Sequence, residues 1–210
     1  MTINDTLQRA SLRLSVLEFR GKREYGLCIR HKEEVMGWRV LSAVISVLTF
    51  GKVSLLKKFW TTIGNVVYVP KRVDQNGKVF RFGDLPYEDY CTLSHELAHV
   101  KHFYNLGFPS VKGGRAVGVL LMLLLYFFVF FPVGLAYARY RFEREAYMAG
   151  LLAAHVIGLE IPQRMELAIR YCSTSPTYLW MWPFPQSVRR WFVAEFASRC
   201  RNTVLVPTDV

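Results

Sequence analysis

His95-Glu96-Leu97-Ala98-His99 is the stretch of the sequence on which the fold and the chemistry both depend. Side chains four residues apart lie on the same face of a helix, so His95 and His99 can offer two imidazole nitrogens to one ion. Glu96 follows the first histidine directly, where its carboxylate can reach a water bound to that ion. The spacing therefore predicts a zinc site with a glutamate general base, and the alternative is a solvated, charged helix face.

The sequence around the motif predicts one helix over residues 84–105. At its start, Asp84 is the expected N-cap and Pro86 lies in the first turn, with acidic residues near the positive end of the helix. Apolar residues then recur at spacings of three and four: Leu93, Leu97, Val100 and Tyr104. The motif thus lies on a helix that has both a start signal and a side suited to a core.

The composition suits a single domain that meets a membrane surface. The chain has 210 residues, of which 52% are hydrophobic and 15% aromatic, and its formal net charge is +11. Such a balance points to anionic headgroups or to nucleic acid, and we favour the membrane because the scattered basic residues form no nucleic-acid motif. The four cysteines form no CxxC pair, which predicts free thiols: Cys28, Cys91, Cys172 and Cys200.

A β-hairpin is predicted before the motif helix. Residues 61–69 are rich in β-branched side chains and predict one strand, and residues 79–82 alternate and predict a second. The dipeptide Asn76-Gly77 between them favours a tight turn. Helical patterns predict four further helices: one of about 16 residues that contains Leu41 and Leu48 and ends at Gly51, and three at about 139–158, 163–172 and 187–200. The first of these helices either joins the core or lies on a membrane surface, helped by nearby lysines.

A catalytic zinc ion needs a third protein ligand, and Glu143 is the predicted one. Ala146 follows it three residues later, and a small residue at that place lets two helices approach each other. Glu145 is the alternative ligand, but it lies about 200° round the helix from Glu143, so both cannot face the ion. Without a metal, both glutamates would form a charged helix face with Arg141 and Arg144.

The remaining histidines have lesser predicted roles. His102 shares the face of His95 and His99, but it lies a further turn along and is predicted to line the rim of the site. His155 is predicted to be structural, with donation to a substrate as the alternative. His31 has no chemical partner that the sequence indicates.

Residues 116–138 form a run of 23 residues without a charge, which is long enough to cross a bilayer. A single crossing would place His99 and Glu143 about 30 Å apart, whereas zinc ligands lie about 2 Å from the ion. Basic residues also flank the run evenly, which argues against a single crossing. We therefore expect an apolar helical hairpin that bends near residues 131–134, inserted shallowly in a membrane or against another apolar surface, with both ends on the cytoplasmic side.

Three segments of the chain resemble the small HExxH zincin-like proteins of bacteria and bacteriophages. Those proteins are similar in outline to minimal gluzincin peptidases. The segments are residues 61–70 (TTIGNVVYVP), 93–100 (LSHELAHV) and 142–147 (FEREAY). The resemblance covers about residues 60–150.

The resemblance implies roles for particular residues. His95, His99 and Glu143 would bind zinc, Glu96 would activate water, and the strand before the motif helix would bind the backbone of a substrate. Many membrane-linked gluzincins have an aspartate four residues after the ligand glutamate. This chain has Tyr147 there, whose hydroxyl can donate to a substrate oxyanion.

The sequence predicts an α+β fold, namely a mainly helical zincin-like domain with a short hairpin before the motif helix and an apolar helical hairpin between the metal ligands. One domain of 1–210 has four parts: an N-terminal helical or membrane-surface region (1–60), the β-hairpin and motif helix (61–115), the apolar hairpin (116–138), and the third-ligand and C-terminal helices (139–210). We expect a membrane-associated zinc metallopeptidase that acts on protein or peptide substrates, with a place in the virion if a phage encodes it. The alternative is a non-enzymatic membrane or virion component with a structural or vestigial metal site.

Overall fold

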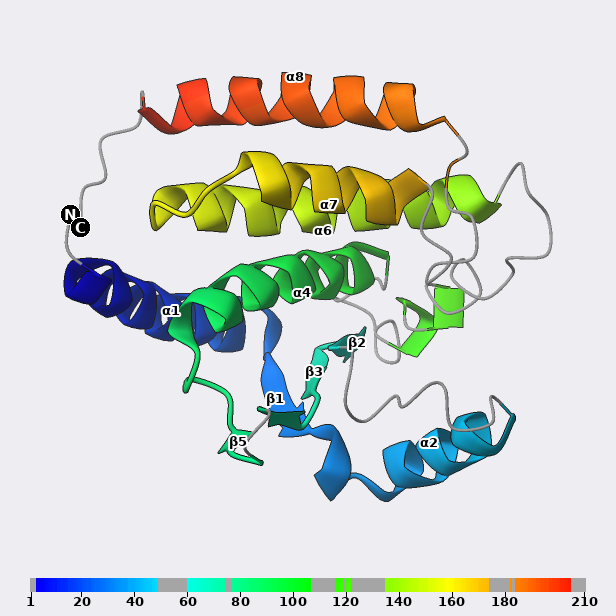
Figure 1. Cartoon of the computed structure of the whole chain (residues 1–210). Coiled ribbons are helices and arrows are strands. Elements are labelled where there is room, and N and C mark those ends of the chain that lie inside the picture. Colours follow the sequence, from blue (N-terminus) through cyan, green and yellow to red (C-terminus); the bar gives the residue numbers. More distant parts are fainter. Residues whose placement is uncertain are drawn as a thin grey trace.

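The computed structural model shows a mainly helical chain with a small sheet (Figure 1), which confirms the α+β class in its general form. It describes residues 3–48, 60–74, 77–106, 116–118, 120–121, 135–173, 182 and 184–204. The helices are α1 (Ile3–Tyr25), α2 (Met36–Leu48), α4 (Pro86–Leu106), α6 (Leu135–Val156), α7 (Pro162–Ser173) and α8 (Pro185–Val204). The strands are β1 (Cys28–His31), β2 (Thr61–Ile63), β3 (Val66–Val69), β4 (Arg72–Val73) and β5 (Val79–Phe80), and the short 3-10 helix η1 covers Lys32–Glu34.

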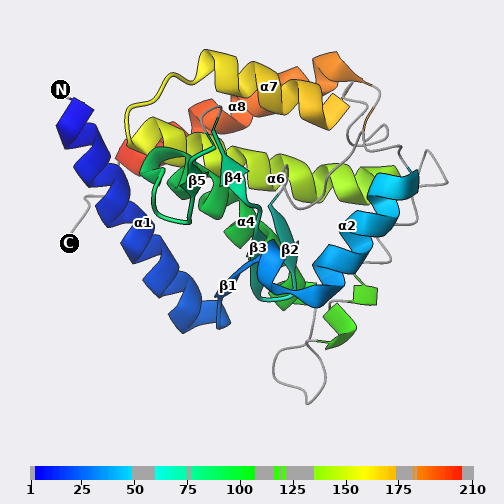
Figure 2. The same ribbon diagram turned by 60° about the horizontal axis from the view of Figure 1, so that its bottom comes forward.

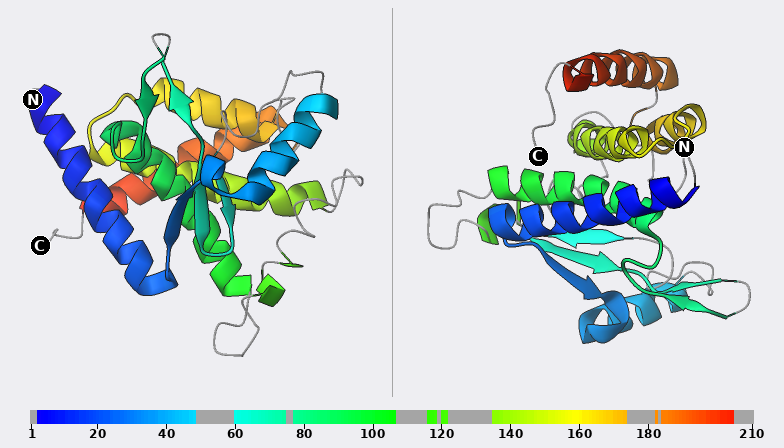
Figure 3. Two further views of the ribbon diagram at one scale, coloured as in Figure 1. Left: turned by 90° about the horizontal axis from the view of Figure 1, so that it is seen from below. Right: turned by 90° about the vertical axis from the view of Figure 1, so that its left-hand side faces the viewer.

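The elements stack in layers on either side of α4 (Figures 1 and 3). On one side α4 packs against α6, which α7 and α8 cover in turn. On the other side the sheet lies against α4, and α2 lies beyond the sheet. α1 packs along α4 as well. The predicted metal motif is therefore carried by a helix that other elements hold from several directions.

α4 begins at Pro86, as the proline in the first predicted turn indicates, because proline tolerates the first helical position. The expected N-cap role of Asp84 is wrong. Its carboxylate instead accepts a hydrogen bond of 2.7 Å from the backbone N–H of Arg81 and so closes the turn that precedes the helix. Asp89 in the first turn is fully buried and forms an ion pair with Arg72, with 2.7 Å between Oδ1 and Nη1. This pair fixes the small β4–β5 hairpin to the start of α4.

The predicted apolar face of α4 is confirmed. Leu93 and Val100 are fully buried, in one cluster with Leu14 of α1 and Val67 of β3. Leu97 packs against the same cluster. Tyr104 makes an edge-to-face contact with Tyr25, with 5.4 Å between ring centroids. The spacing of three and four thus placed this side of the helix in the core, as amphipathic periodicity requires.

The sheet differs from the predicted hairpin. Residues 61–69 form two strands, β2 and β3, because Gly64 has a positive φ of 62° and makes a turn between them. The expected turn at 76–77 belongs to a second small hairpin, in which β4 pairs with β5. β1, which the sequence pattern did not indicate, pairs in parallel with β3 and completes the order β1-β3-β2. β2 is therefore an edge strand of its sheet.

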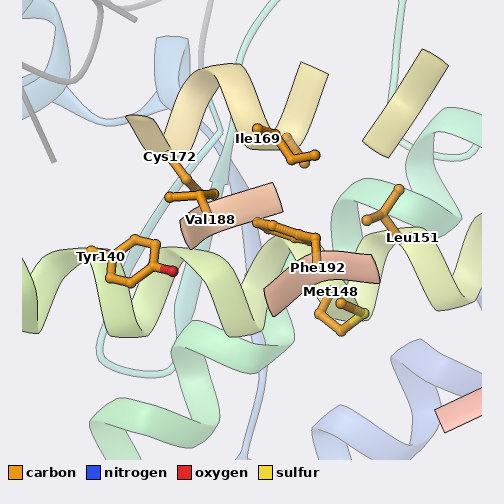
Figure 4. Packing of buried hydrophobic residues seen from close by; sticks show 8 residues of the cluster. Tyr140, Met148, Leu151, Ile169, Cys172, Val188 and Phe192 are labelled. Carbon is orange, nitrogen blue, oxygen red and sulfur yellow. The ribbon is translucent and has the colours of Figure 1, made fainter. Parts of the chain in front are cut away.

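The C-terminal helices were predicted with small errors in their bounds. The third-ligand helix α6 begins at Leu135, inside the apolar run, and ends before Gly158, which has a positive φ of 81°. α7 and α8 lie at the two predicted C-terminal positions. Apolar side chains of the three helices fill one core (Figure 4): Tyr140, Met148, Leu151, Ala168, Ile169, Cys172, Val188 and Phe192.

Most of the apolar hairpin expected at 116–138 lies outside the described residues, and so does its bend at 131–134. The described pieces of this run are helical at 116–118 and 120–121, and its end forms the first turn of α6. The helix of about 16 residues that was expected to end at Gly51 is α2, whose described bounds are Met36–Leu48. Among the described residues no helix has the length and hydropathy needed to cross a bilayer. All four cysteines are unpaired, as expected.

Candidate metal centre

α4 and α6 approach each other closely at the predicted site (Figure 2). Ala146 of α6 is fully buried, as its small size suggested. Gly150 allows a close approach, because a Cβ atom added there would lie 3.2 Å from the carbonyl oxygen of Cys91 and 3.8 Å from Cβ of His95. Cys91 is a buried residue of the helix interface, with a pKa raised to about 11 by burial. The sequence pattern predicted that Ala146 lets the two helices approach, but the role of Gly150 was not predicted.

This approach brings His95, His99 and Glu143 together. Nε2 of His95 lies 3.2 Å from Nε2 of His99, and Oε2 of Glu143 lies 3.6 Å and 3.7 Å from these two nitrogens. Ligands about 2.0–2.1 Å from a tetrahedral zinc ion are separated by about 3.3–3.4 Å. The three distances are close to that value, so one ion fits among the three atoms without a rearrangement of the helices. Glu143 and His99 are buried and His95 is mostly so.

The charges of the site favour a cation at this point. Burial and the neighbouring His99 lower the pKa of His95 to about 3. Burial also acts to lower the pKa of His99, but the carboxylates of Glu143 and Glu96 outweigh it and raise this pKa. A metal binds only the neutral imidazole, and His95 is neutral at any physiological pH. The negative charge that draws a proton to His99 equally draws a metal ion.

Glu96 points to the sheet side of α4. Its Oε2 accepts a hydrogen bond of 2.6 Å from the hydroxyl of Thr62 on β2. Burial raises the pKa of Glu96, and the charge of Glu143 adds to this shift, whereas His99, the hydrogen bond from Thr62 and Lys32 oppose it. A carboxylate whose pKa is raised is a better proton acceptor, so this environment suits a general base.

Lys32 is a fully buried lysine of η1 that contacts β2. Its ammonium donates a hydrogen bond of 2.8 Å to the hydroxyl of Thr61 and lies 4.5 Å from the ring centroid of Trp38. Burial lowers the pKa of Lys32 to about 8, and the negative charge of Glu96 partly offsets this effect. Successive side chains of a strand point to opposite faces. Thr61 and Thr62 of β2 therefore contact two different groups: Thr61 accepts a hydrogen bond from Lys32, and Thr62 donates one to Glu96.

Sequence reasoning missed Lys32, Thr62 and Gly150 as neighbours of the site. Gly150 had a usable signal, since it lies seven residues after Glu143 and therefore on the same face of its helix. Thr62 lies in the segment that carried the family resemblance, but its contact with Glu96 depends on the register of β2. Lys32 had no signal, because it is followed by two acidic residues and has the pattern of a surface charge.

Tyr147, the predicted oxyanion donor, lies beside the site. Its ring makes an edge-to-face contact with His95, with 4.6 Å between centroids, and is stacked on Tyr171 of α7 at 5.9 Å. The position is compatible with a hydroxyl near a substrate, and the catalytic role stays a prediction.

Glu145, the alternative third ligand, points away from the histidines. Its Oε2 accepts a hydrogen bond of 2.8 Å from Arg199 of α8. Of the two candidate glutamates, only Glu143 therefore shares a cluster with the histidines.

The other histidines are separate from the three-residue cluster. The ring of His102 lies 6.1 Å from that of His99 and 4.9 Å from that of Phe142, at the margin of the site, as predicted. Burial lowers the pKa of His102 to about 4. His155 is exposed and contacts Phe196. His31 lies on β1, paired in register with Val69.

No family model matches the chain, and no curated protein or solved structure is similar enough to match it.

Proposed function

We propose that the protein is a zinc metallopeptidase with a zincin-like arrangement of its motif helix, edge strand and third-ligand helix. The observation that carries the proposal is the convergence of His95, His99 and Glu143. Residues 44 positions apart in the sequence lie within ligand distance of one ion, with their donor atoms within 4.8 Å of one another. Two imidazoles and one carboxylate are the ligand set of the zinc peptidases with a glutamate ligand.

The residues present fit zinc better than a hard cation. Calcium and magnesium take oxygen ligands at higher coordination numbers, whereas two of the three donors here are imidazole nitrogens. Three protein ligands leave a fourth position, which is the open position of a catalytic site. An ion bound there would supply Lewis acidity and make a coordinated water more acidic.

In the proposed reaction, Glu96 takes a proton from the attacking water and passes it to the leaving amine. Thr62 orients the carboxylate through its hydrogen bond to Oε2, and its hydroxyl belongs to the strand that would carry the substrate. Tyr147 would donate to the oxyanion that forms on the substrate carbonyl. These roles place the acid–base groups on the sheet side of α4 and the oxyanion donor on α6.

β2 would hold the substrate. It pairs with β3 along one edge, and among the described residues no strand pairs with its other edge. An extended peptide can add to such an edge through backbone hydrogen bonds, which recognise any sequence. This mode suits a peptidase whose substrate has an extended backbone. Association with a membrane, which the apolar run at 116–138 suggests, remains part of the proposal.

The metal is tested by zinc content after purification and dialysis. We expect one zinc ion per chain in the wild type and in Glu145→Ala, whose side chain pairs with Arg199. Glu143→Ala should lose the ion, because two imidazoles alone hold zinc weakly. Equal zinc in both variants, or none in a folded wild type, would contradict the metal assignment and favour the non-enzymatic alternative.

Catalysis is tested separately with Glu96→Gln in the zinc-loaded protein and a mixture of unrelated peptides as substrate. The variant should keep zinc and lose cleavage by about 100-fold or more, since general base catalysis contributes about 10²–10⁴. Full activity of Glu96→Gln would eliminate the assigned base even if zinc is bound.

A further inference from the structure

The outward side of α1 has an unusual pattern for a helix of a globular domain. Leu12, Val16 and Phe19 are 67%, 51% and 67% exposed. Their spacing of four and three places them on one stripe. Ala10 and Leu14, on the opposite side of the helix, are buried against the rest of the protein. α1 therefore has two apolar sides, and only one of them is used by the fold.

Arginines border this exposed stripe. Arg9, Arg13, Arg20 and Arg23 are all exposed. Arg20 lies 3.9 Å from the exposed carboxylate of Glu24, an ion pair that water screens. A shallow hollow on the same face is lined by Val16, Phe19, Arg20, Arg23 and Glu24. Apolar and basic side chains thus share one surface.

We propose that this face of α1, defined by Leu12, Val16, Phe19 and the four bordering arginines, lies on an anionic membrane surface. A helix that places leucine and phenylalanine towards the acyl chains and arginines at the headgroups is the usual interfacial arrangement. Each basic residue near an anionic bilayer adds to the attraction. α1 carries five basic and three acidic residues, and the whole chain has a net charge of +11, so the attraction is general as well as local.

The charge also decides against a second copy of the chain as the occupant. Two copies that joined through this face would bring their arginine borders together while each carries a net charge of +11. Like charges set opposite each other disfavour such a contact. An anionic surface has the complementary charge, and it does not require a matching shape.

A second apolar element is found at the same end of the molecule. Val117, Leu120 and Leu121 are 44%, 58% and 38% exposed and begin the uncharged run of 23 residues. Figure 3 shows this short helical piece at the end of the molecule where α1 also ends, and α1 along an outer edge. One membrane surface can therefore be in reach of both elements. This inference adds an orientation to the proposed peptidase and does not depend on the metal ion.

The test is cosedimentation of the full-length protein with vesicles of phosphatidylcholine alone or mixed with phosphatidylglycerol. The wild type should bind the anionic vesicles more tightly than the neutral ones. Leu12→Ser/Phe19→Ser should lose about tenfold or more in affinity, because two large apolar side chains no longer enter the bilayer. The matched control is Leu167→Ser/Val193→Ser, which changes side chains that are 48% and 51% exposed on α7 and α8 and should bind as the wild type does.

A second variant, Arg9→Gln/Arg13→Gln/Arg23→Gln, keeps the apolar stripe and changes only exposed side chains. It should bind anionic vesicles more weakly and with less dependence on salt. Zinc content and circular dichroism of every variant separate a membrane effect from misfolding and from failure of the metal proposal. Unchanged binding of both α1 variants, equal binding to neutral vesicles, or no binding by the wild type would each overturn the inference. So would a wild-type dimer that the Leu12→Ser/Phe19→Ser variant dissociates.

Discussion

Two buried carboxylates, Asp89 on α4 and Glu143 on α6, are compensated in different ways. Asp89 lies against Arg72 and also accepts a hydrogen bond of 2.7 Å from the backbone N–H of Gly83. Glu143 lies against the imidazoles of His95 and His99. A guanidinium is protonated at all relevant pH values, whereas His95, with a pKa of about 3, is neutral. His99 is charged only when it binds a proton, which the carboxylates of Glu143 and Glu96 favour by raising its pKa against the effect of burial.

Asp89 thus belongs to a structural site, whereas Glu143 belongs to a site suited to a ligand. The protein supplies a permanent positive charge to Asp89, which is enclosed and joined to the β4–β5 hairpin. At Glu143 the partners are metal-binding nitrogens, and the charge balance improves when a cation arrives.

Arg72→Met should destabilise the protein by about 3–5 kcal/mol, because it leaves the carboxylate of Asp89 buried without its cation. The measurement is urea unfolding of the metal-free protein, compared with the wild type. A loss below about 1 kcal/mol would mean that water or another group compensates Asp89, and that the two sites differ less than their geometry indicates.

Gly150→Val should cost about 1–3 kcal/mol, since the added side chain forces α6 away from the backbone of α4. It should also weaken zinc binding, because Glu143 moves with α6. Gly37→Ala is the control: an added Cβ at Gly37 meets no atom within 4 Å, and the change should be neutral or slightly stabilising. Zinc titration and thermal unfolding measure the two effects, and tight zinc binding by Gly150→Val would show that close helix contact is not what places Glu143.

Lys32→Met should change how stability depends on pH. The pKa of Lys32 is about 8 in the folded protein and 10.5 in an ordinary lysine, so between these values the unfolded chain holds a proton that the folded chain has released. Wild-type stability should therefore rise, relative to Lys32→Met, as the pH increases from 8 to 10, and the difference should be constant below that window. Chemical unfolding across this range measures it, with Lys22→Met as a control for loss of an exposed cation. A difference that is flat throughout would indicate that Lys32 is solvated.

Glu143→Gln should have the smallest effect on the metal-free protein, about 1 kcal/mol or less, because an amide of the same shape still meets two imidazoles. The same variant should lose the stabilisation that zinc gives the wild type, which is about 2.7 kcal/mol when free zinc is 100 times the dissociation constant. A large loss in the metal-free state would place Glu143 in the same class as Asp89 and reverse the comparison.

The helical part of this site could be predicted from the sequence because its determinants are local. Spacings of three and four placed Leu93 and Val100 in the core, and Pro86 marked the start of the helix. The period of a helix also showed that Glu143 and Glu145 cannot both face the ion. The choice of Glu143 needed more than this period: it rested on Ala146 three residues later, the pattern by which many zinc peptidases with a glutamate ligand supply it.

The sheet could not be predicted in the same way, since its determinants are distant in sequence. Whether 61–69 is one strand or two depends on the turn at Gly64, and the β-branched residues around it indicated a continuous strand. β1 has four residues and forms only by pairing with β3, which begins 35 residues after β1 ends. The burial of Lys32 depends on that same pairing, because Trp38 and Thr61 reach it from other elements.

The most direct test of the metal centre is X-ray absorption at the zinc edge of the purified wild type beside Glu143→Ala. We expect two imidazole nitrogens and oxygen ligands at about 2.0–2.2 Å from zinc in the wild type, and the loss of the carboxylate oxygen or of the metal in the variant. A sulfur ligand at about 2.3 Å, or identical spectra for the two proteins, would contradict it.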